Sequence, residues 1–288
     1  GRSRSRLWGL PKRRRPAPSP WPVYLASARN SFAMALVGWN ANAHAKGGLV
    51  NSTKHRARVA GFLYLLVVLT APIGLIYVPS KLLVRGNATA TIDNIRASEW
   101  LLRLGIASEL IHQIIWVFVV LALYRLLKPV SEPLARQMVV LGAYVSVPIA
   151  FVNVLNNIAA LVLAGGADFL LVFERPQVDA LAYLFVRLHG QGITVVSIFW
   201  GLWLLPFGLL VIRSGFIPRV FGVLLLIAGV AYVASAFADL VLPQYAPMVS
   251  RVAEPLAFAE LPIVFWLLIW GAKTRPAAAP GGPIPANV

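Results

Sequence analysis

A long apolar segment between residues 100 and 126 contains two side chains that can exchange protons or bind a metal ion. Glu109 and His112 are three residues apart, so on a helix they would lie on one face, one turn from each other. A carboxyl group and an imidazole at this spacing can share a proton, bond to neighbouring helices or supply two metal ligands. The adjacent Gln113 adds an amide. Because buried polar groups are costly without partners, we expect partners for them elsewhere in the chain.

Polar side chains also interrupt three other apolar segments. Asn153, Asn156 and Asn157 occur in one segment, His189 and Gln191 in another, and Glu260 in the last. An acid inside a membrane costs at least about 2.5–3.5 kcal/mol, so these groups should face each other or a water-filled cavity. We therefore predict a polar intramembrane layer or ligand site made of Glu109, His112, Gln113, Asn153, Asn156, Asn157, His189, Gln191 and Glu260.

Four interpretations of this layer remain open. It can join the helices by hydrogen bonds, or it can line a cavity for a ligand or a proton. Glu109 and His112, with His189 and Glu260, can also supply metal ligands, as a Glu-x-x-His motif does in di-iron bundles. His112 and His189 can hold a haem between them. We find no catalytic serine–histidine–aspartate set or phosphate-binding loop in the sequence, so no residue is assigned as catalytic.

The composition indicates a membrane protein. Of the 288 residues, 59% are hydrophobic and 12% are charged, and the mean hydropathy is +0.75. Soluble domains contain about 25% charged residues, so this chain has too little polar surface to cover a water-soluble globule of its size. There is no cysteine, which excludes disulfides and thiolate chemistry. Nucleic-acid binding is not expected, because the basic residues are not interleaved with aromatic ones.

Apolar segments long enough to cross a bilayer recur along the chain, and they predict an all-α transmembrane helical bundle. Gly215, which can take the left-handed conformation that ends a helix, is followed by Pro218, and this order is typical of a turn between two helices. Gly201 and Gly208, like Gly222 and Gly229, are seven residues apart, which favours close helix packing. We expect six spans, at about 57–78, 100–126, 136–164, 180–212, 218–242 and 255–272.

The distribution of basic residues predicts the orientation of these spans in the membrane. Basic residues are concentrated in loops 125–137 and 213–219 and in the segments outside the first and last spans. Since basic loops favour the cytoplasmic side, we predict that both termini are cytoplasmic. The loop 79–99 is an exception, because it holds Lys81, Arg85 and Arg96 on the opposite side. With this orientation, and about 1.5 Å of rise per residue, the polar layer should lie between the outer interface and the midplane.

The two ends of the chain differ from the membrane domain, which we place at residues 54–273. Residues 1–53 carry the run Lys12 to Arg15, and we expect a disordered basic tail beside anionic lipid, or a natural start near Val50. A signal peptide cleaved near Ala45 is disfavoured, because it would leave basic residues outside. Residues 274–288 are rich in proline, glycine and alanine, and we expect a cytoplasmic tail.

Several motifs resemble one family. The segment Phe199 to Gly208 reads FWGLWLLPFG, and the segment Arg213 to Gly222 reads RSGFIPRVFG. Together with Arg58 to Tyr64 and with Gly165 to Asp168, they resemble bacterial domain-of-unknown-function family 4386. The resemblance covers about 54–273. It implies a multi-pass protein of the bacterial inner membrane and assigns no catalytic residue.

Taken together, these observations predict an integral membrane protein that is a non-catalytic module for protons, small solutes or a partner protein. The lipid bilayer is its expected partner, and a protein partner or a second copy is left open. No cofactor is expected under this hypothesis. The alternative is a membrane-embedded metal- or haem-binding redox protein or enzyme that uses Glu109, His112, His189 and Glu260.

Overall fold

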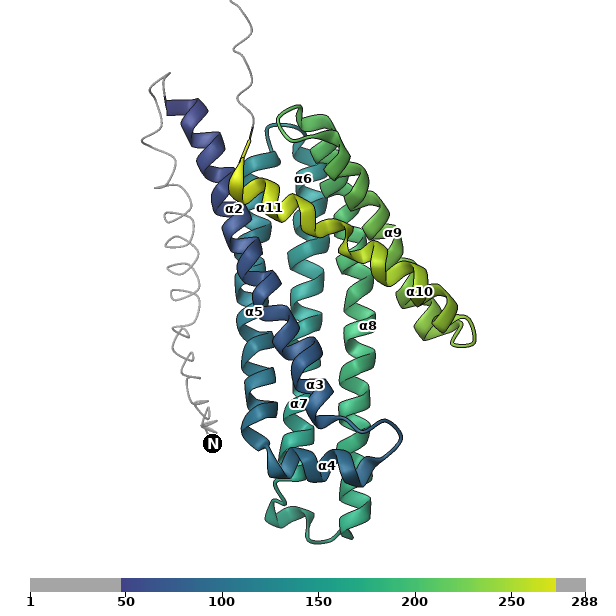
Figure 1. The fold of residues 1–288 in the computed structure, drawn as a ribbon. Coiled ribbons are helices and arrows are strands. Elements are labelled where there is room, and N and C mark those ends of the chain that lie inside the picture. Colours follow the sequence, from purple (N-terminus) through teal and green to yellow (C-terminus); the bar gives the residue numbers. More distant parts are fainter. Residues whose placement is uncertain (1–47, 273–288) are drawn as a thin grey trace, which may run out of the picture. The chain divides into compact units, whose positions relative to one another are not determined.

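The computed structural model describes residues 48–272, and every regular element in this part of the chain is a helix (Figure 1). Six of the helices are long and apolar enough to cross a membrane. This confirms the predicted all-α transmembrane bundle with six spans. The chain is therefore a multi-pass integral membrane protein. The expectations for the tails at 1–47 and 274–288 lie outside the described residues.

Three of the spans contain a break in their α-helical geometry. The first is α2 (Gly48–Pro72), continued by the π-helix η1 (Ile73–Tyr77) and by α3 (Val78–Leu82). The third joins α6 (Glu132–Val139), the π-helix η2 (Val140–Val145) and α7 (Ser146–Ala164). The sixth joins α10 (Ala246–Ala257), the 3-10 turn η4 (Phe258–Glu260) and α11 (Leu261–Ile269).

The other three spans are continuous helices: α5 (Glu99–Leu127), α8 (Arg175–Ser214) and α9 (Arg219–Val241). The helix α2 begins at Gly48, but the apolar membrane span within it begins at Thr53. Predicted and observed spans then agree within about five residues at each end, except at the start of the sixth span. That helix begins at Ala246, nine residues before the predicted position. Its first turns contain Arg251 and Glu254, and these charges made the segment resemble a loop.

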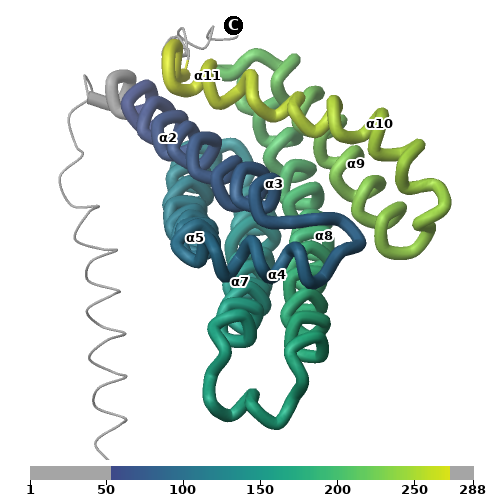
Figure 2. The backbone as a smooth tube through the Cα atoms, turned by 60° about the horizontal axis from the view of Figure 1, so that its bottom comes forward, coloured from purple at the N-terminus to yellow at the C-terminus, as the bar shows by residue number. Residues whose placement is uncertain are grey.

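Within residues 48–272, α5, α7 and α8 run side by side, and α9 and α10 form an inclined hairpin beside α8 (Figures 1 and 2). The N-terminal half of α2 packs against α11, where Arg58 Nη2 donates a hydrogen bond of 3.0 Å to the Ile269 carbonyl. We call the end of the bundle that carries Arg58, Lys128, Arg136, Arg213 and Arg219 the basic end. The helix α4 (Ala88–Ala97) lies across the opposite end, which we call the α4 end.

The α8–α9 contact explains the glycine spacing found in the sequence. A Cβ atom on Gly201 would lie 2.6 Å from the carbonyl oxygen of Gly229, and one on Gly208 would lie 2.7 Å from that of Gly222. The reciprocal distances, from Gly229 and Gly222, are 2.8 and 2.6 Å. The two backbones thus touch at two points, one above the other, and the predicted close packing is confirmed. At the turn between these helices, Gly215 has a φ of 70° and ends α8, as predicted.

The segment 79–99, predicted to be a loop, contains α4. Thr91, Ile92 and Ile95 of this helix are buried against the bundle. Its Arg96 forms an ion pair with the buried Asp179 of α8 and donates a hydrogen bond of 3.1 Å to the Ala164 carbonyl. The hydrogen bond to Asp179 raises the pKa of Arg96 above its usual value. This pairing compensates one of the three basic residues that contradicted the charge rule in this segment.

We expect Asp179→Asn to lower the free energy of unfolding by about 2 kcal/mol, because it leaves Arg96 without its buried counter-ion. The measurement is unfolding of the detergent-solubilised protein, followed by circular dichroism. Asp168→Asn is the matched control, since Asp168 is an exposed acid at the same end of the bundle. Equal stability of the two variants would contradict the structural role of the ion pair.

Candidate functional site

The polar side chains predicted to form one layer are divided between two places. Glu109, His189, Asn153 and Asn156 are in contact with one another, and we call this set the Glu109 cluster. Glu260 lies apart from them, in a second site with Tyr64 and Tyr232.

At the centre of the Glu109 cluster is a pair of titratable groups from α5 and α8. Oε1 of Glu109 lies 3.2 Å from Nε2 of His189. The Glu109 side chain is 10% exposed and the His189 side chain 12%. A carboxyl and an imidazole at hydrogen-bond distance in such an enclosed position can share one proton.

Asn153 of α7 holds the other side of the imidazole. Its Nδ2 donates a hydrogen bond of 3.0 Å to the His189 carbonyl and lies 3.2 Å from His189 Nδ1. The Asn153 carbonyl oxygen is 3.3 Å from the same Nδ1. Asn156 Nδ2 donates to Asn153 Oδ1 at 3.0 Å, which fixes the orientation of the amide. His189 Nδ1 therefore faces one donor and one acceptor.

Two glycines leave room for this cluster. A Cβ atom on Gly192 would overlap the Asn153 side chain, and one on Gly74 would lie 2.8 Å from Glu109 Cγ. Gly74 belongs to η1, the π-helical turn that follows Pro72. π-helical turns are frequent at functional sites, because they reposition the side chains around them.

The remaining residues of the predicted layer surround the cluster. Asn157 is buried and lines the same cavity as Glu109 and His189, whose volume is about 230 Å³. Gln113 is buried, and its Oε1 has no hydrogen-bond partner among the described residues. Gln191 is exposed and lines an adjoining cavity of about 410 Å³ together with Arg187. His112 is not among the residues that line the cavity of Glu109 and His189.

Cavities that share lining residues lie between the two sites. A small cavity of about 20 Å³, large enough for about one water molecule, is lined by both Glu109 and His112. His112 also lines a cavity of about 270 Å³ that contains Glu260, and we call it the Glu260 pocket. Leu75 of η1 lines all four cavities. Titratable groups thus follow one another in the order His189, Glu109, His112 and Glu260.

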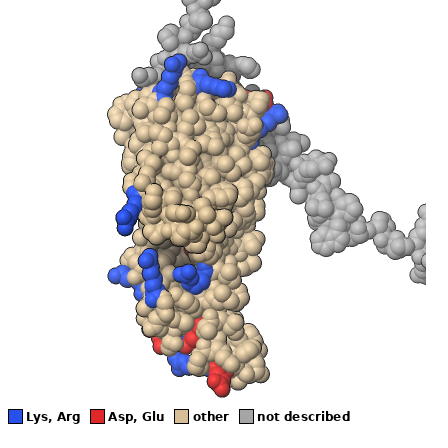
Figure 3. Space-filling model, turned by 90° about the vertical axis from the view of Figure 1, so that its right-hand side faces the viewer, with Lys and Arg blue, Asp and Glu red and all other residues tan. Residues whose placement is uncertain are grey.

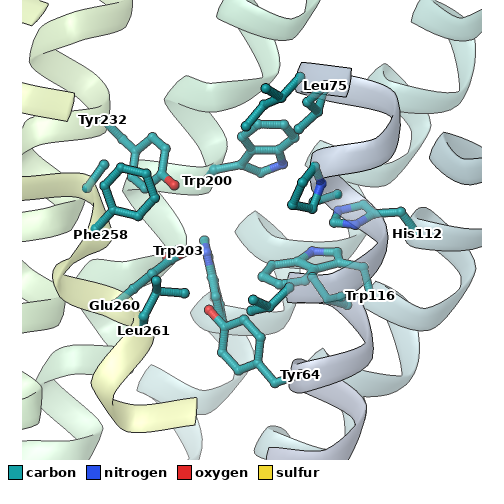
Figure 4. A pocket seen from close by; sticks show the side chains of 16 residues that line it. Tyr64, Leu75, His112, Trp116, Trp200, Trp203, Tyr232, Phe258, Glu260 and Leu261 are labelled. Atoms are coloured by element: carbon teal, nitrogen blue, oxygen red, sulfur yellow. The ribbon is translucent and has the colours of Figure 1, made fainter. Parts of the chain in front are cut away.

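The Glu260 pocket lies between α2, α5, α8, α9 and the η4 turn (Figure 4). The Tyr64 and Tyr232 hydroxyls interact with the Glu260 carboxyl. Trp116 and Trp203 stand edge to face, with ring centroids 4.8 Å apart. Trp116 Nε1 donates a hydrogen bond of 2.6 Å to the carbonyl of Gly142 in η2, so the second π-helical turn positions this ring.

The two sites are at different depths. At about 1.5 Å of rise per residue, Tyr64, Trp116 and Trp203 lie about 16 Å from the ends of their spans at the basic end. This is about half of a 30 Å hydrocarbon core, so the Glu260 pocket is near the midplane. Glu109, Asn153 and His189 lie about 27 to 37 Å from the same end, measured in the same way. The Glu109 cluster is therefore closer to the α4 end, and Glu260 is deeper than predicted.

The early start of α10 is the reason for this difference in depth. Counted from Ala246, Glu260 is well inside the sixth span, whereas counted from the predicted start it was close to the membrane surface. Sequence reasoning also missed Tyr64, Tyr232, Trp200 and Trp203. Aromatic rings fit both a plain membrane helix and a ligand pocket, so their residue types alone gave no signal.

Comparison with known proteins agrees with the resemblance seen in the sequence. A family model described as domain of unknown function (DUF4386) matches residues 59–271. The chain belongs to the DUF4386 family. No curated protein and no solved structure matches this DUF4386 chain. The matched residues contain both the Glu109 cluster and the Glu260 pocket.

The four side chains considered for a metal or haem site are not gathered in this DUF4386 protein. Among the residues that the structure describes, no group of three or more His, Asp and Glu side chains is placed to hold a metal ion. His112 lines the Glu260 pocket and His189 the cavity beside Glu109, and none of the cavities described above has both in its wall. The structure thus brings Glu109 and His189 together and places His112 and Glu260 in another cavity.

Proposed function

We propose that this chain is a non-catalytic membrane module that transfers protons, with Glu109 and His189 as its proton-exchanging pair. The observation that carries the proposal is that His189 has hydrogen-bond partners in both of its charge states. As an imidazolium, it can donate from Nε2 to Glu109 and from Nδ1 to the Asn153 carbonyl. As a neutral ring that has given its Nε2 proton to Glu109, it can accept a hydrogen bond from the protonated carboxyl at Nε2 and still donate from Nδ1 to the Asn153 carbonyl.

A proton-exchanging group needs such an environment. A buried group that loses its partners when it gains or loses a proton is strongly biased toward one state. Here the Asn153 carbonyl can accept from His189 Nδ1 before and after the transfer, while the Asn153 amide keeps its hydrogen bond to the His189 carbonyl. The proton can then move between Glu109 and His189 without leaving a buried polar group unpaired.

The cavities support a route for the proton between the α4 end and Glu260. The 230 and 410 Å³ cavities connect the pair with the α4 end, and the water-sized cavity and His112 lead from Glu109 to Glu260. Beyond the Glu260 pocket, an apolar core that includes Leu123, Leu127 and Phe207 fills the bundle. We therefore expect slow, controlled transfer and not the rate of an open channel.

We further infer that the chain lies in the bacterial cytoplasmic membrane with both termini in the cytoplasm. The family resemblance implies this membrane. Basic side chains at the basic end support the orientation. On the face drawn in Figure 3, most acidic side chains gather toward the end that carries the 165–174 turn. Under this orientation the Glu109 cluster is in the outer half of the bilayer.

The experiment is the decay of an imposed pH gradient in vesicles that contain the purified protein and an internal pH dye. Valinomycin and potassium hold the membrane potential constant. We expect the gradient to decay faster than in protein-free vesicles, in proportion to the protein content. A decay rate that does not depend on the protein would overturn the proposal.

A further inference from the structure

The wall of the Glu260 pocket is aromatic and carries one acid. Trp116, Trp200, Trp203, Phe258 and the two tyrosines supply the rings (Figure 4). Glu260 is the single acid among the sixteen lining residues, and there is no Lys or Arg among them. The faces of aromatic rings carry partial negative charge and attract cations, most strongly in the case of tryptophan. The pocket is thus suited to positive charge and unsuited to anions.

Two polar atoms in the pocket wall are not within hydrogen-bond distance of any described residue. Tyr64 is 1% exposed, and its hydroxyl faces the Glu260 carboxyl without reaching this distance. The lone pairs of this phenolic oxygen can face a bound cation. The Nδ1 atom of His112, on the opposite wall, also has no partner within residues 53–272.

The pocket is also accessible from the side of the bundle. Ile76 of η1 and Phe258 of η4 both line it, and each is 64% exposed. Both residues belong to apolar membrane spans: Phe258 is near the midplane, and Ile76 is about 34 Å from the basic end of its span, at the depth of the Glu109 cluster. We therefore expect their exposed faces to meet lipid and not water. A molecule with an apolar chain can therefore reach Glu260 from the bilayer.

We propose that the Glu260 pocket binds a lipophilic organic cation, with a quaternary ammonium head held by Glu260 and the aromatic rings and an alkyl chain that extends into the lipid. The head group is surrounded by Trp200, Trp203 and Tyr232, as in the aromatic cages that recognise quaternary ammonium groups. A volume of about 270 Å³ holds such a head and the first part of the chain. The site shares His112 with the route that leads from the Glu109–His189 pair, but binding to it is measured without any proton transfer.

The test uses two probes of nearly identical shape. Radiolabelled dodecyltrimethylammonium and its neutral carbon isostere, which carries a tert-butyl head, are equilibrated with the full protein in lipid nanodiscs. Empty nanodiscs correct for partition into lipid. We expect saturable binding of the cation, and at least tenfold weaker binding of the neutral isostere. Absence of saturable binding, or equal binding of both probes, would overturn the proposal.

Substitutions in the pocket test whether the cation binds at Glu260 and Trp200. Glu260→Gln should remove the preference for the cation, whereas Glu254→Gln, which removes an exposed acid from α10, should preserve it. Trp200→Leu should weaken binding of the cation about three- to thirtyfold, which is the range of cation–π interactions. This variant provides a second test if Glu260→Gln does not fold. Cation binding that is unchanged in a folded Glu260→Gln or Trp200→Leu protein would contradict this location. Because Glu109 is untouched, these outcomes do not depend on proton transfer.

Discussion

Replacing both Gly201 and Gly208 of α8 by alanine is expected to lower the free energy of unfolding by about 2–6 kcal/mol. Each added methyl group would meet a backbone carbonyl of α9, at 2.6 and 2.7 Å. Backbone atoms cannot rotate away as a flexible side chain can. The helices must therefore separate, and they lose the dispersion contacts that hold helices together in lipid.

The measurement is resistance of the reconstituted protein to unfolding by sodium dodecyl sulfate, followed by tryptophan fluorescence. Gly190→Ala is the matched control on the same helix, because a Cβ atom there meets nothing within 4 Å. Alanine favours helix over glycine by up to about 1 kcal/mol, so this control should be as stable as the original or slightly more so. A double variant as stable as Gly190→Ala would contradict the close α8–α9 contact.

The glycine contact also illustrates what the sequence was able to predict. In lipid, every backbone group must be bonded within the chain, so long apolar segments are necessarily helical, and their positions can be read directly. Glycines at seven-residue spacing mark a helix face in the same way. The prediction of six spans and of the α8–α9 packing depends on these local constraints alone.

The composition of the candidate site was harder to predict, because depth along a helix does not determine which side chains meet. Glu109 and His189 form a pair because of the rotation of α8, which Gly192 allows by leaving room for Asn153. His112 is one turn from Glu109 and shares the water-sized cavity with it, but it also lines the Glu260 pocket, which Glu109 does not. Which helix faces are opposed depends on packing between spans, and no residue pattern within a single span reveals it.

Glu109→Gln is expected to reduce the protein-dependent proton transfer at least tenfold. Glutamine has nearly the shape of glutamic acid and can still bond to His189, so the packing of α5, α7 and α8 should be preserved. It cannot accept or release a proton at neutral pH, and the exchange between the two side chains is lost. The change therefore separates proton transfer from structural support.

Glu99→Gln is the matched control for this variant. Glu99 is an acid on the same helix, but it is exposed at the α4 end and paired with Arg103, outside the four connected cavities. Its replacement removes the same charge from α5 and leaves the Glu109 cluster intact. We expect proton transfer by this variant to equal that of the unmodified protein.

The most direct test of the central claim is the decay rate of a pH gradient in vesicles that contain equal amounts of the two variants. If Glu109 and His189 exchange the transferred proton, the Glu109→Gln vesicles should decay at nearly the rate of protein-free vesicles. The Glu99→Gln vesicles should keep the full protein-dependent rate. Equal rates for the two folded variants would show that the Glu109 cluster only holds the helices together.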